Sequence, residues 1–458
     1  MCFWVSSTHV VLRNPVLRTS TRTALILSGL VVLSSLVALA PIHDAATGLS
    51  SLGVHLTLPW HYRVWAPFCS VLDALSVLSI RQHIVLLATY IVGYAAWRIV
   101  RRASLRALHP EYRRPWRSAC LWETGFACIA VVAWVGIYVA GALVPRPMSS
   151  LTLADPDAVT VDFHSHTNAS WDGVKRFTAE ANRAWHREAG FDVAYISDHA
   201  TVAGALQGMR HNPVTAGSDV VLLPAVEARY GGQHIIAMGI RPDRDVHADG
   251  NWREPALKPG TDAPMLMLTI PGNLSRIDTQ QYPGLARLAA IELADAAPRG
   301  IDQLQRQRRT VLDFAARHNI AVIASSDNHG WGSTAAAWSV LHIPNWRSMS
   351  PTTLDAAIQR AITQHGRSAV QVLARRAPDP GASVALLALT PVAVSVNYLR
   401  TLSWPERASW LGWIWAVWCV VTVVPITVPV RRPVADEPAL AHERIPELVP
   451  ETVADDSY

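Results

Sequence analysis

Five long apolar runs flank a central segment in which apolar and polar residues alternate more closely. Residues 24–41 carry no charge and are just long enough to cross a bilayer, and residues 126–145 are a stronger candidate of the same kind. The uncharged part of residues 84–99 is shorter than these two runs, whereas residues 381–399 and 408–430 carry no charge at all. The pattern predicts about three transmembrane helices before the central segment and about two after it, with buried core helices as the alternative.

The distribution of arginine predicts which side of the membrane the central segment faces. Residues 1–22 contain three arginines and no acid, and residues 98–117 contain seven arginines and one glutamate, so both are expected in the cytoplasm. Three crossings from a cytoplasmic N-terminus predict a multi-pass protein of the cell membrane whose central segment is extracytoplasmic. The arginine pairs at 375–376 and 431–432 argue against this orientation, and it inverts if the second apolar run does not cross.

The central segment, residues 150–378, alternates runs of period two with helical patterns. Helices are expected at 178–189, which Gly190 ends, at 302–318 and at 351–365. Strands are expected at 158–163, 192–197, 219–226, 233–240, 265–270, 288–293, 320–325, 337–343 and 368–374. Strand–helix alternation predicts an α/β fold with a parallel sheet or barrel, inserted between the transmembrane helices.

Composition separates this central domain from its surroundings. Residues 1–149 and 379–432 form the two membrane regions, and residues 433–458 are acidic and proline-rich, which predicts a disordered tail. The central domain contains 22 Lys+Arg and 22 Asp+Glu between residues 151 and 378, so no stable nucleic-acid partner is expected. It contains no cysteine, so any metal there must bind through nitrogen and oxygen.

Potential metal ligands stand at the ends of the predicted strands. His164 and His166 lie two residues apart after the first strand, so both imidazoles point to one face. Later strands end in the same residue types, at Asp198-His199, Glu227, His234 and Asp327-Asn328-His329. Ligands gathered from the ends of several parallel strands are typical of a barrel-type active site. Imidazole and carboxylate suit zinc, manganese or iron, and so many ligands imply two or more divalent ions.

These motifs resemble those of a known family. His164-Ser165-His166, Asp172-Gly173, Ser197-Asp198-His199, Glu227, His234 and Asp327-x-His329, in this order, resemble the PHP (polymerase and histidinol phosphatase) family of metal-dependent phosphoesterases. The resemblance covers residues 158–345. It implies a distorted (β/α)7 barrel that holds two or three divalent ions.

The resemblance also implies which residues hold each ion. One ion would be held by His164, His166, Glu227 and Asp327, and a second by Asp172, His199 and His329. A third would be held by Glu227, His234 and one further histidine, but residue 270 is isoleucine where that histidine is expected. The third ion is therefore missing, weakly held, or completed by another group such as Asn273 or water.

The function that the resemblance implies is hydrolysis by a membrane-anchored enzyme. A metal-bridged hydroxide would cleave a small phosphorylated substrate, namely a phosphomonoester, a nucleotide or a short oligonucleotide. Asp198 is expected to orient a histidine or to form a plain salt bridge. Arg229, Arg241 and Arg276 are candidates to bind phosphate, and His186 is expected to be an ordinary surface histidine.

Two alternative functions remain open at this level. A similar metal site can hydrolyse amides or esters without phosphorus, and an arginine pair close to the metals would argue against that. The chain could also be a membrane sensor that binds metal and ligand without turnover, which the isoleucine at position 270 favours and the many retained ligands oppose. The oligomeric state does not follow from the sequence.

Overall fold

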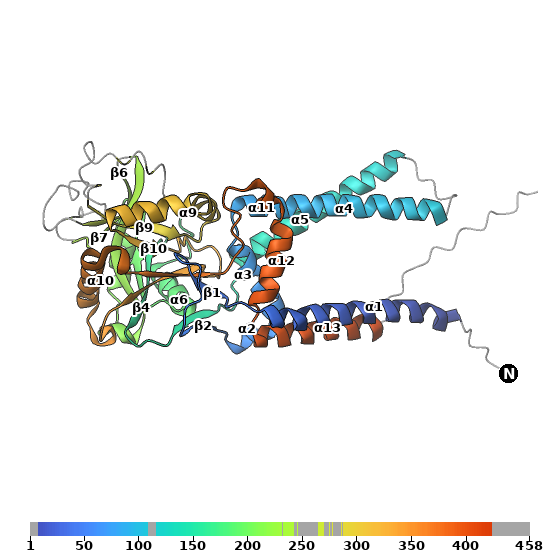
Figure 1. Cartoon of the computed structure of the whole chain (residues 1–458), viewed down its shortest axis with the longest axis horizontal. Coiled ribbons are helices and arrows are strands. Elements are labelled where there is room, and N and C mark those ends of the chain that lie inside the picture. Colours follow the sequence, from blue (N-terminus) through green and yellow to red (C-terminus); the bar gives the residue numbers. More distant parts are fainter. Residues whose placement is uncertain are drawn as a thin grey trace, which may run out of the picture. The chain divides into compact units, whose positions relative to one another are not determined.

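The protein is described by a computed structural model, drawn in Figure 1. By its internal contacts the chain forms two compact units, Met1–Ala24 with Trp415–Tyr458, and Leu25–Ile414. The larger unit contains the central domain. The residues that the structure describes are 8–108, 116–230, 232–241, 245, 264–269, 274, 277, 285 and 287–423. The predicted acidic tail, 433–458, lies outside them.

Among the described residues, ten strands form one sheet in the order β1-β12-β11-β4-β5-β6-β7-β8-β9-β10. Nine of the ten overlap the strands expected from the apolar pattern, because most of their residues are buried and many are aliphatic. The strands are β1 (Ile42–Asp44), β4 (Ala158–Ser165), β5 (Val193–Ile196), β6 (Val221–Tyr230), β7 (Gln233–Met238), β8 (Met265–Leu268), β9 (Leu288–Ala294), β10 (Ala321–Ala324), β11 (Ala337–His342) and β12 (Gln371–Arg375).

The sheet is mixed, so the prediction of a parallel sheet is only partly right. Strands β4, β5 and β6 run parallel, as do β8, β9 and β10, but β7 runs antiparallel to both of its neighbours. The reason is a tight hairpin: Tyr230 pairs with Gln233, and Gly232 has a positive φ of 70°. Strand β11 is also antiparallel to β4.

The sheet curls until the end of β10 meets the end of β4. Ser165 and Asn328 form a parallel bridge. The backbone N–H of Asp327 donates to the carbonyl of His164 at 2.9 Å, and that of His166 donates to the carbonyl of Asn328 at 3.0 Å. The strands β4 to β10 therefore form a curled sheet in which two ligand-bearing segments are bonded side by side, as a distorted barrel requires.

The three expected helices of the central domain are present, as α6 (Ala179–Ala189), α9 (Pro298–His318) and α10 (Pro351–His365). Thr178 caps α6 by accepting from the N–H of Ala181, and Ser350 caps α10 in the same way. Helix α9 begins earlier than expected, with Pro298 in its first turn. A further short helix, α7 (Ala203–Met209), follows β5.

In the described part of the chain, three helices are long and apolar enough, by length and composition, to cross a membrane. They are α1 (Thr8–Leu33), α4 (Ile80–Leu108) and α5 (Trp116–Leu143), with candidate spans Arg18–Val37, Ile80–Ser104 and Cys120–Leu143. The predicted span at 381–399 differs, because it is divided between α11 (Val384–Ala388) and α12 (Thr390–Thr401), each shorter than a crossing needs. The predicted span at 408–430 falls in α13 (Trp404–Val423), and its last residues lie outside the described chain.

The segment between the first two candidate spans belongs partly to the central domain. Strand β1 pairs antiparallel with β12, and β2 (Val54–Thr57) pairs with β3 (Ser150–Leu153). The short helices α2 (Trp60–Val64) and α3 (Ala66–Ser76) follow β2. Sequence periodicity placed these residues in the N-terminal membrane region, because pairing with a strand some 300 residues away leaves no local pattern.

Candidate metal centre

The predicted ligands come together where the ends of the strands meet. His164 lies in β4, with His166 directly after it, and His199 follows β5. Glu227 lies in β6 and His234 in β7, on paired antiparallel strands. Asp327 and His329 follow β10, and Asp172 lies in the loop after β4. Curling of the sheet thus gathers residues separated by up to 165 positions in the chain.

Four ligand atoms form the buried core of this cluster. The Nε2 atoms of His164 and His166 lie 3.0 Å apart. Glu227 Oε2 lies 3.2 Å from His164 Nε2 and 3.4 Å from His166 Nε2. Asp327 Oδ1 lies 3.3 Å from each of the same two nitrogens.

These separations are those expected of ligands that share one ion. Two ligand atoms about 2.1 Å from an ion, subtending about 90–110°, lie roughly 3.0–3.4 Å from each other. At such a separation, two imidazole Nε2 atoms cannot form a hydrogen bond with each other if both carry a proton or if neither does. A cation between them and the two carboxylates satisfies all four groups, so the residues present fit a divalent ion.

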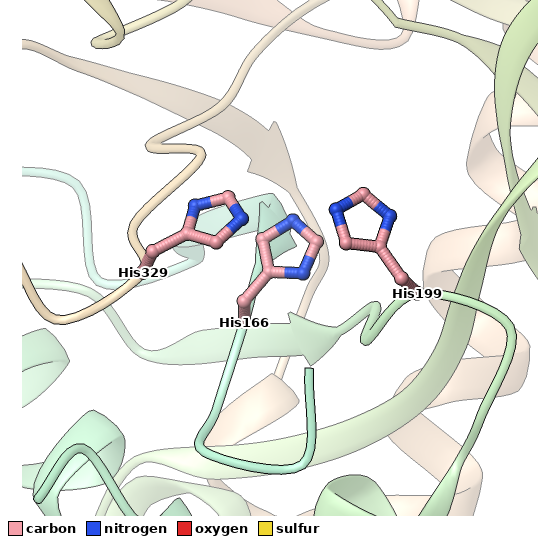
Figure 2. Close-up of side chains that lie close together, drawn as sticks. All are labelled: His166, His199 and His329. Atoms are coloured by element: carbon pink, nitrogen blue, oxygen red, sulfur yellow. The ribbon is translucent and has the colours of Figure 1, made fainter. Parts of the chain in front are cut away.

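A second group of ligands adjoins the first. His166, His199 and His329 present nitrogens that all lie within 4.8 Å of one another (Figure 2). Asp172 Oδ2 lies 3.2 Å from His199 Nε2 and 3.3 Å from His329 Nε2. The buried Asp172 Oδ1 and His329 Nε2 have no hydrogen-bond partner among the described residues, as expected of ligands whose partner is an ion.

The charges of the cluster favour the binding of a cation. Burial lowers the pKa of His164, but the carboxylates of Asp327 and Glu227 outweigh burial and raise that pKa well above its usual value. Burial raises the pKa of Glu227, but the neighbouring imidazoles hold it far below its usual range. The pKa of Asp327 is lowered for the same reason. Positive charge is thus strongly favoured here, and either protons or metal ions can supply it.

The backbone is strained at two positions of the centre. Asp327 has a φ of 45° and Ala200, next to His199, has a φ of 55°, although neither is glycine. Such conformations cost of order 1–3 kcal/mol and persist only where surrounding structure enforces them. The bond from the Ala200 N–H to the carbonyl of Glu227 at 2.9 Å ties one of these turns to β6.

Glu292 supports the centre and was not singled out from the sequence. It is fully buried in β9, and its Oε1 lies 2.9 Å from His164 Nδ1 and accepts from the Ser325 hydroxyl at 2.7 Å. A carboxylate oxygen in this place can accept from the Nδ1–H of His164, and in that tautomer Nε2 is the atom that can bind an ion. The sequence feature that could have indicated this role is a glutamate inside the otherwise apolar run LAAIELA.

Two predictions about neighbouring residues differ from the structure. Asp198 accepts from the Thr167 N–H at 2.6 Å and from the Thr167 hydroxyl at 2.8 Å, so it holds the loop after His166 instead of orienting a histidine. Burial raises the pKa of Asp198. His186 is not a surface histidine: it is fully buried, with Nε2 2.8 Å from Asp162 Oδ2. Helix α6 carries it inward, and its sequence spacing did not reveal this.

Only part of the expected third site lies in described residues. His234 Nδ1 lies 2.8 Å from Glu227 Oε1, while its Nε2 accepts from Arg229 Nε at 3.2 Å. Both ring nitrogens of His234 are thus engaged by protein. The remaining predicted members, Ile270 and Asn273, lie outside the described residues.

Among the described residues, the arginines predicted to bind phosphate do not form a group at the metal centre. Arg229 is exposed and contacts the edge of the cluster through His234. Arg241 follows β7, and its backbone N–H donates to Asp245 at 2.9 Å. Arg276 lies outside the described residues.

Comparison with known proteins gives distant likenesses in structure alone. No family model and no curated protein matches the chain. PsfC from Pseudomonas syringae PB-5123 is 14% identical, over 52% of this chain and 98% of that chain, with a TM-score of 0.32. A two-domain protein from Bacteroides vulgatus, containing a predicted PHP-like metal-dependent phosphoesterase, is 14% identical over 43% of this chain and 62% of that one, with a TM-score of 0.29.

A third solved structure has a different described activity. An amidohydrolase from Chromobacterium violaceum, with bound sulfate and no metal, is 16% identical over 43% of this chain and 96% of that one, with a TM-score of 0.27. At these identities and TM-scores the likenesses assign neither a family nor an activity to the chain.

Proposed function

We propose that this chain is a membrane-anchored, metal-dependent hydrolase of phosphoesters, related to the PHP family. The observation that carries the proposal is the group of His164, His166, Glu227 and Asp327, whose ligand atoms lie 3.0–3.4 Å apart in a buried cluster. A second set at the same place, Asp172, His199 and His329, provides for a neighbouring ion.

Two divalent ions held by these residues would supply an activated water and offset negative charge on the phosphoryl oxygens. Glu227 is suited to lie between two ions, since its Oε2 is 3.2 Å from both His164 Nε2 and His199 Nδ1. Glu292 keeps His164 in the tautomer that can bind.

The ligands differ in how far their side chains are exposed to solvent. The side chains of His164, His166 and Glu227 are almost wholly buried, whereas Asp172 is 29% exposed and His234 is 43% exposed. In the reaction the oxygen of water forms a bond to phosphorus while the ester P–O bond breaks. The departing oxygen takes up a proton that the water has lost, so the products are an alcohol and a phosphate.

The flanking helices support membrane anchoring. The helices α1, α4 and α5 each contain a candidate span, and the segment between α1 and α4 contributes β1 to the central sheet. With that segment on the side of the central domain, α1 and α4 would cross in opposite directions and α5 would return. The cluster of arginines at the far end of α4 would then stay in the cytoplasm, and the central domain would lie outside.

The test uses the full chain purified in detergent. Bound metal per chain is measured first, and then hydrolysis of p-nitrophenyl phosphate, bis-p-nitrophenyl phosphate and a p-nitroanilide amide with added manganese or zinc. The double variant Asp327→Ala/His329→Ala should lose both metal and activity. Its matched control is Asp155→Ala/His342→Ala, which removes an exposed Asp–His pair 3.0 Å apart and should retain both.

Each outcome has a definite meaning. Metal with turnover of a phosphate reporter, lost in the first variant alone, supports the proposal. Metal with turnover of the amide and of neither phosphate would favour the amide-hydrolase alternative. Metal without turnover of any reporter would favour a binding protein, and a chain without metal would overturn the proposal.

A further inference from the structure

A cavity of about 530 Å³ extends from the metal centre to the helices α3, α4 and α5. One end is lined by Asp327, Asn328 and His329, which include two predicted ligands. The other end is mostly apolar and is lined by Leu72 and Leu75 of α3, Ile80 of α4 and Ile137 of α5. Ser76, His83 and Tyr138 also line the cavity, and the last two are hydrogen-bonded to each other. Its volume is within the range of about 300–1,000 Å³ that small-molecule sites occupy.

The apolar end of this cavity coincides with the ends of two candidate membrane spans. Helix α4 begins at Ile80, and Ile137 lies within two turns of the end of α5 at Leu143. Away from the cavity the same helices expose large aliphatic side chains, with Ile84 62% and Ile129 64% exposed. Such surfaces are suited to lipid, so the cavity lies where the bilayer would meet the central domain.

Specific contacts hold the helices against the centre. Asp73 of α3 is buried and accepts from Arg146 at 2.9 Å and from the hydroxyl of Thr334 at 2.7 Å. The N–H of Gly332 donates to the carbonyl of Ala142, in the last turn of α5, at 2.7 Å. The loop that carries His329 is therefore bonded to both α3 and α5, and the cavity is a built feature of the fold.

Two buried N–H groups without a partner belong to residues of the cavity lining. Asn328 Nδ2 and Trp185 Nε1 belong to residues that line the cavity, and both atoms are buried without a hydrogen-bond partner in the described part of the chain. An N–H group in such a position is costly unless a ligand satisfies it. Trp331, in the same lining, is exposed, as aromatic residues are at a membrane interface.

We propose that the substrate is a lipid-type phosphoester, with its phosphate at the metal centre and its hydrocarbon tail in the cavity between α3, α4 and α5. This inference rests on the proposed phosphoesterase function and names its substrate class. A water-soluble phosphate would leave the apolar half of the cavity unused, whereas a long chain buries it at roughly 25 cal/mol per Å² of apolar surface. Hydrolysis of a long-chain alkyl phosphate releases the alcohol and inorganic phosphate, with water supplying the oxygen and the proton.

The test compares two alkyl phosphates on the full chain in nanodiscs of neutral phosphatidylcholine with manganese. The rates on hexadecyl phosphate and butyl phosphate give a chain-length ratio. In Ile137→Trp, which fills the apolar end, the ratio should fall about tenfold, the loss of about 1.4 kcal/mol of binding. The control Ile129→Trp lies on the same helix outside the cavity and should leave the ratio unchanged, which cancels any effect of partitioning into the bilayer.

A second measurement does not depend on turnover or on a variant that folds. Hexadecyl phosphate with a photoreactive diazirine at the end of its chain is cross-linked to the wild-type protein, and the labelled peptides are identified by mass spectrometry. Labelling should concentrate on α3 and on the last two turns of α5, and excess hexadecyl phosphate should compete. Labelling spread evenly along α4 and α5, without competition, would overturn the tail site.

The two proposals fail in different ways. If neither alkyl phosphate nor p-nitrophenyl phosphate is hydrolysed, the phosphoesterase function itself is wrong, and the substrate class falls with it. If butyl phosphate and p-nitrophenyl phosphate are hydrolysed and Ile137→Trp leaves the chain-length ratio unchanged, the lipid-type substrate is wrong and the phosphoesterase function stands.

Discussion

At the scale of single residues, buried carboxylates around the centre form hydrogen bonds that hold its histidines and backbone turns in position. Glu292 touches His164 directly, and Asp162 touches His186 and also accepts from the N–H groups of His164 and Ser326, at 3.2 Å and 3.0 Å. Neither acid is in the expected ligand set. Glu292 contacts the imidazole of a ligand, whereas Asp162 contacts an imidazole that is not a ligand and the backbone beside two ligands. Disrupting the first contact should therefore affect metal binding, and disrupting the second should affect folding.

Glu292→Gln should weaken metal binding while the chain still folds. Gln keeps an oxygen near His164 Nδ1 but loses the charge that makes this imidazole a better ligand, and changes of this kind cost about 10–100-fold in metal affinity. Competition for manganese with a chelator measures the effect. Glu188→Gln, on an exposed position of α6, is the control, and equal affinities of the two variants would contradict the role of Glu292.

His186→Phe should destabilise the fold. The side chains of His186 and Asp162 are both fully buried, and removing the imidazole leaves a carboxylate oxygen without its partner in the core. Breaking a buried pair in this way costs about 3–5 kcal/mol. Unfolding of the detergent-solubilised chain by denaturant measures it, with the exposed His211→Phe as the control. A loss no larger than the control's would mean that the pair contributes little.

At the scale of elements, the ligands depend on how helices and strands are joined. Helix α6 ends at Gly190, which has a φ of 83° and packs against β3. Strand β5 begins three residues later and leads to His199. A fault in this junction would displace both the helix that carries His186 and the strand that positions a ligand.

Gly190→Ala should therefore cost more stability than a left-handed backbone alone explains. A Cβ at position 190 would lie 2.4 Å from the carbonyl oxygen of Leu151, whereas one at Gly48, with a φ of 77°, would meet nothing within 4 Å. Gly48→Ala should lose about 1–2 kcal/mol from the backbone term, and Gly190→Ala should exceed it. Melting temperatures of the two variants give the comparison, and equal losses would show that β3 moves away freely.

At the scale of the whole molecule, the cluster couples stability to pH and metal. The pKa values of His164 and His166 are raised above 6.5, since the pull of Asp327 and Glu227 outweighs burial. Groups with a raised pKa stabilise the fold fully below 6.5 and lose that contribution as pH rises through their folded values. The pKa of His329 is lowered by burial and by His166, so its titration is complete below that window.

Metal-free protein should thus lose stability as pH rises from about 6.5 into the alkaline range. Protons on His164 and His166 then leave, and the carboxylates of Asp327 and Glu227 lose their counter-charge. Manganese should remove this dependence, because the ion replaces the protons. Melting temperatures across pH, with a chelator and with manganese, test both statements, and a metal-free melting temperature that is flat or rises above pH 6.5 would contradict them.

Local pattern was sufficient for most elements of the central domain. Strands such as β4 and β9, and the helices α6 and α10, are recognisable because periodicity, caps and terminal glycines act between residues that are neighbours in sequence. His164 and His166 could be paired for the same reason, since two positions apart on a strand means one face. The remaining predicted ligands except Asp172, which only the resemblance implied, could be named as residues at strand ends, although their distances could not be known.

By itself, the sequence determined the existence and type of these elements and a set of nitrogen and oxygen ligands without thiolates. It predicted five spans, of which three are helices of span length in the described residues. Tertiary structure alone decided the antiparallel direction of β7, the pairing of β1 with β12, the place of Glu292 behind His164, and the cavity beside α3. The physical reason is that these features depend on contacts between distant residues, which form only when the sheet curls and the helices pack on it.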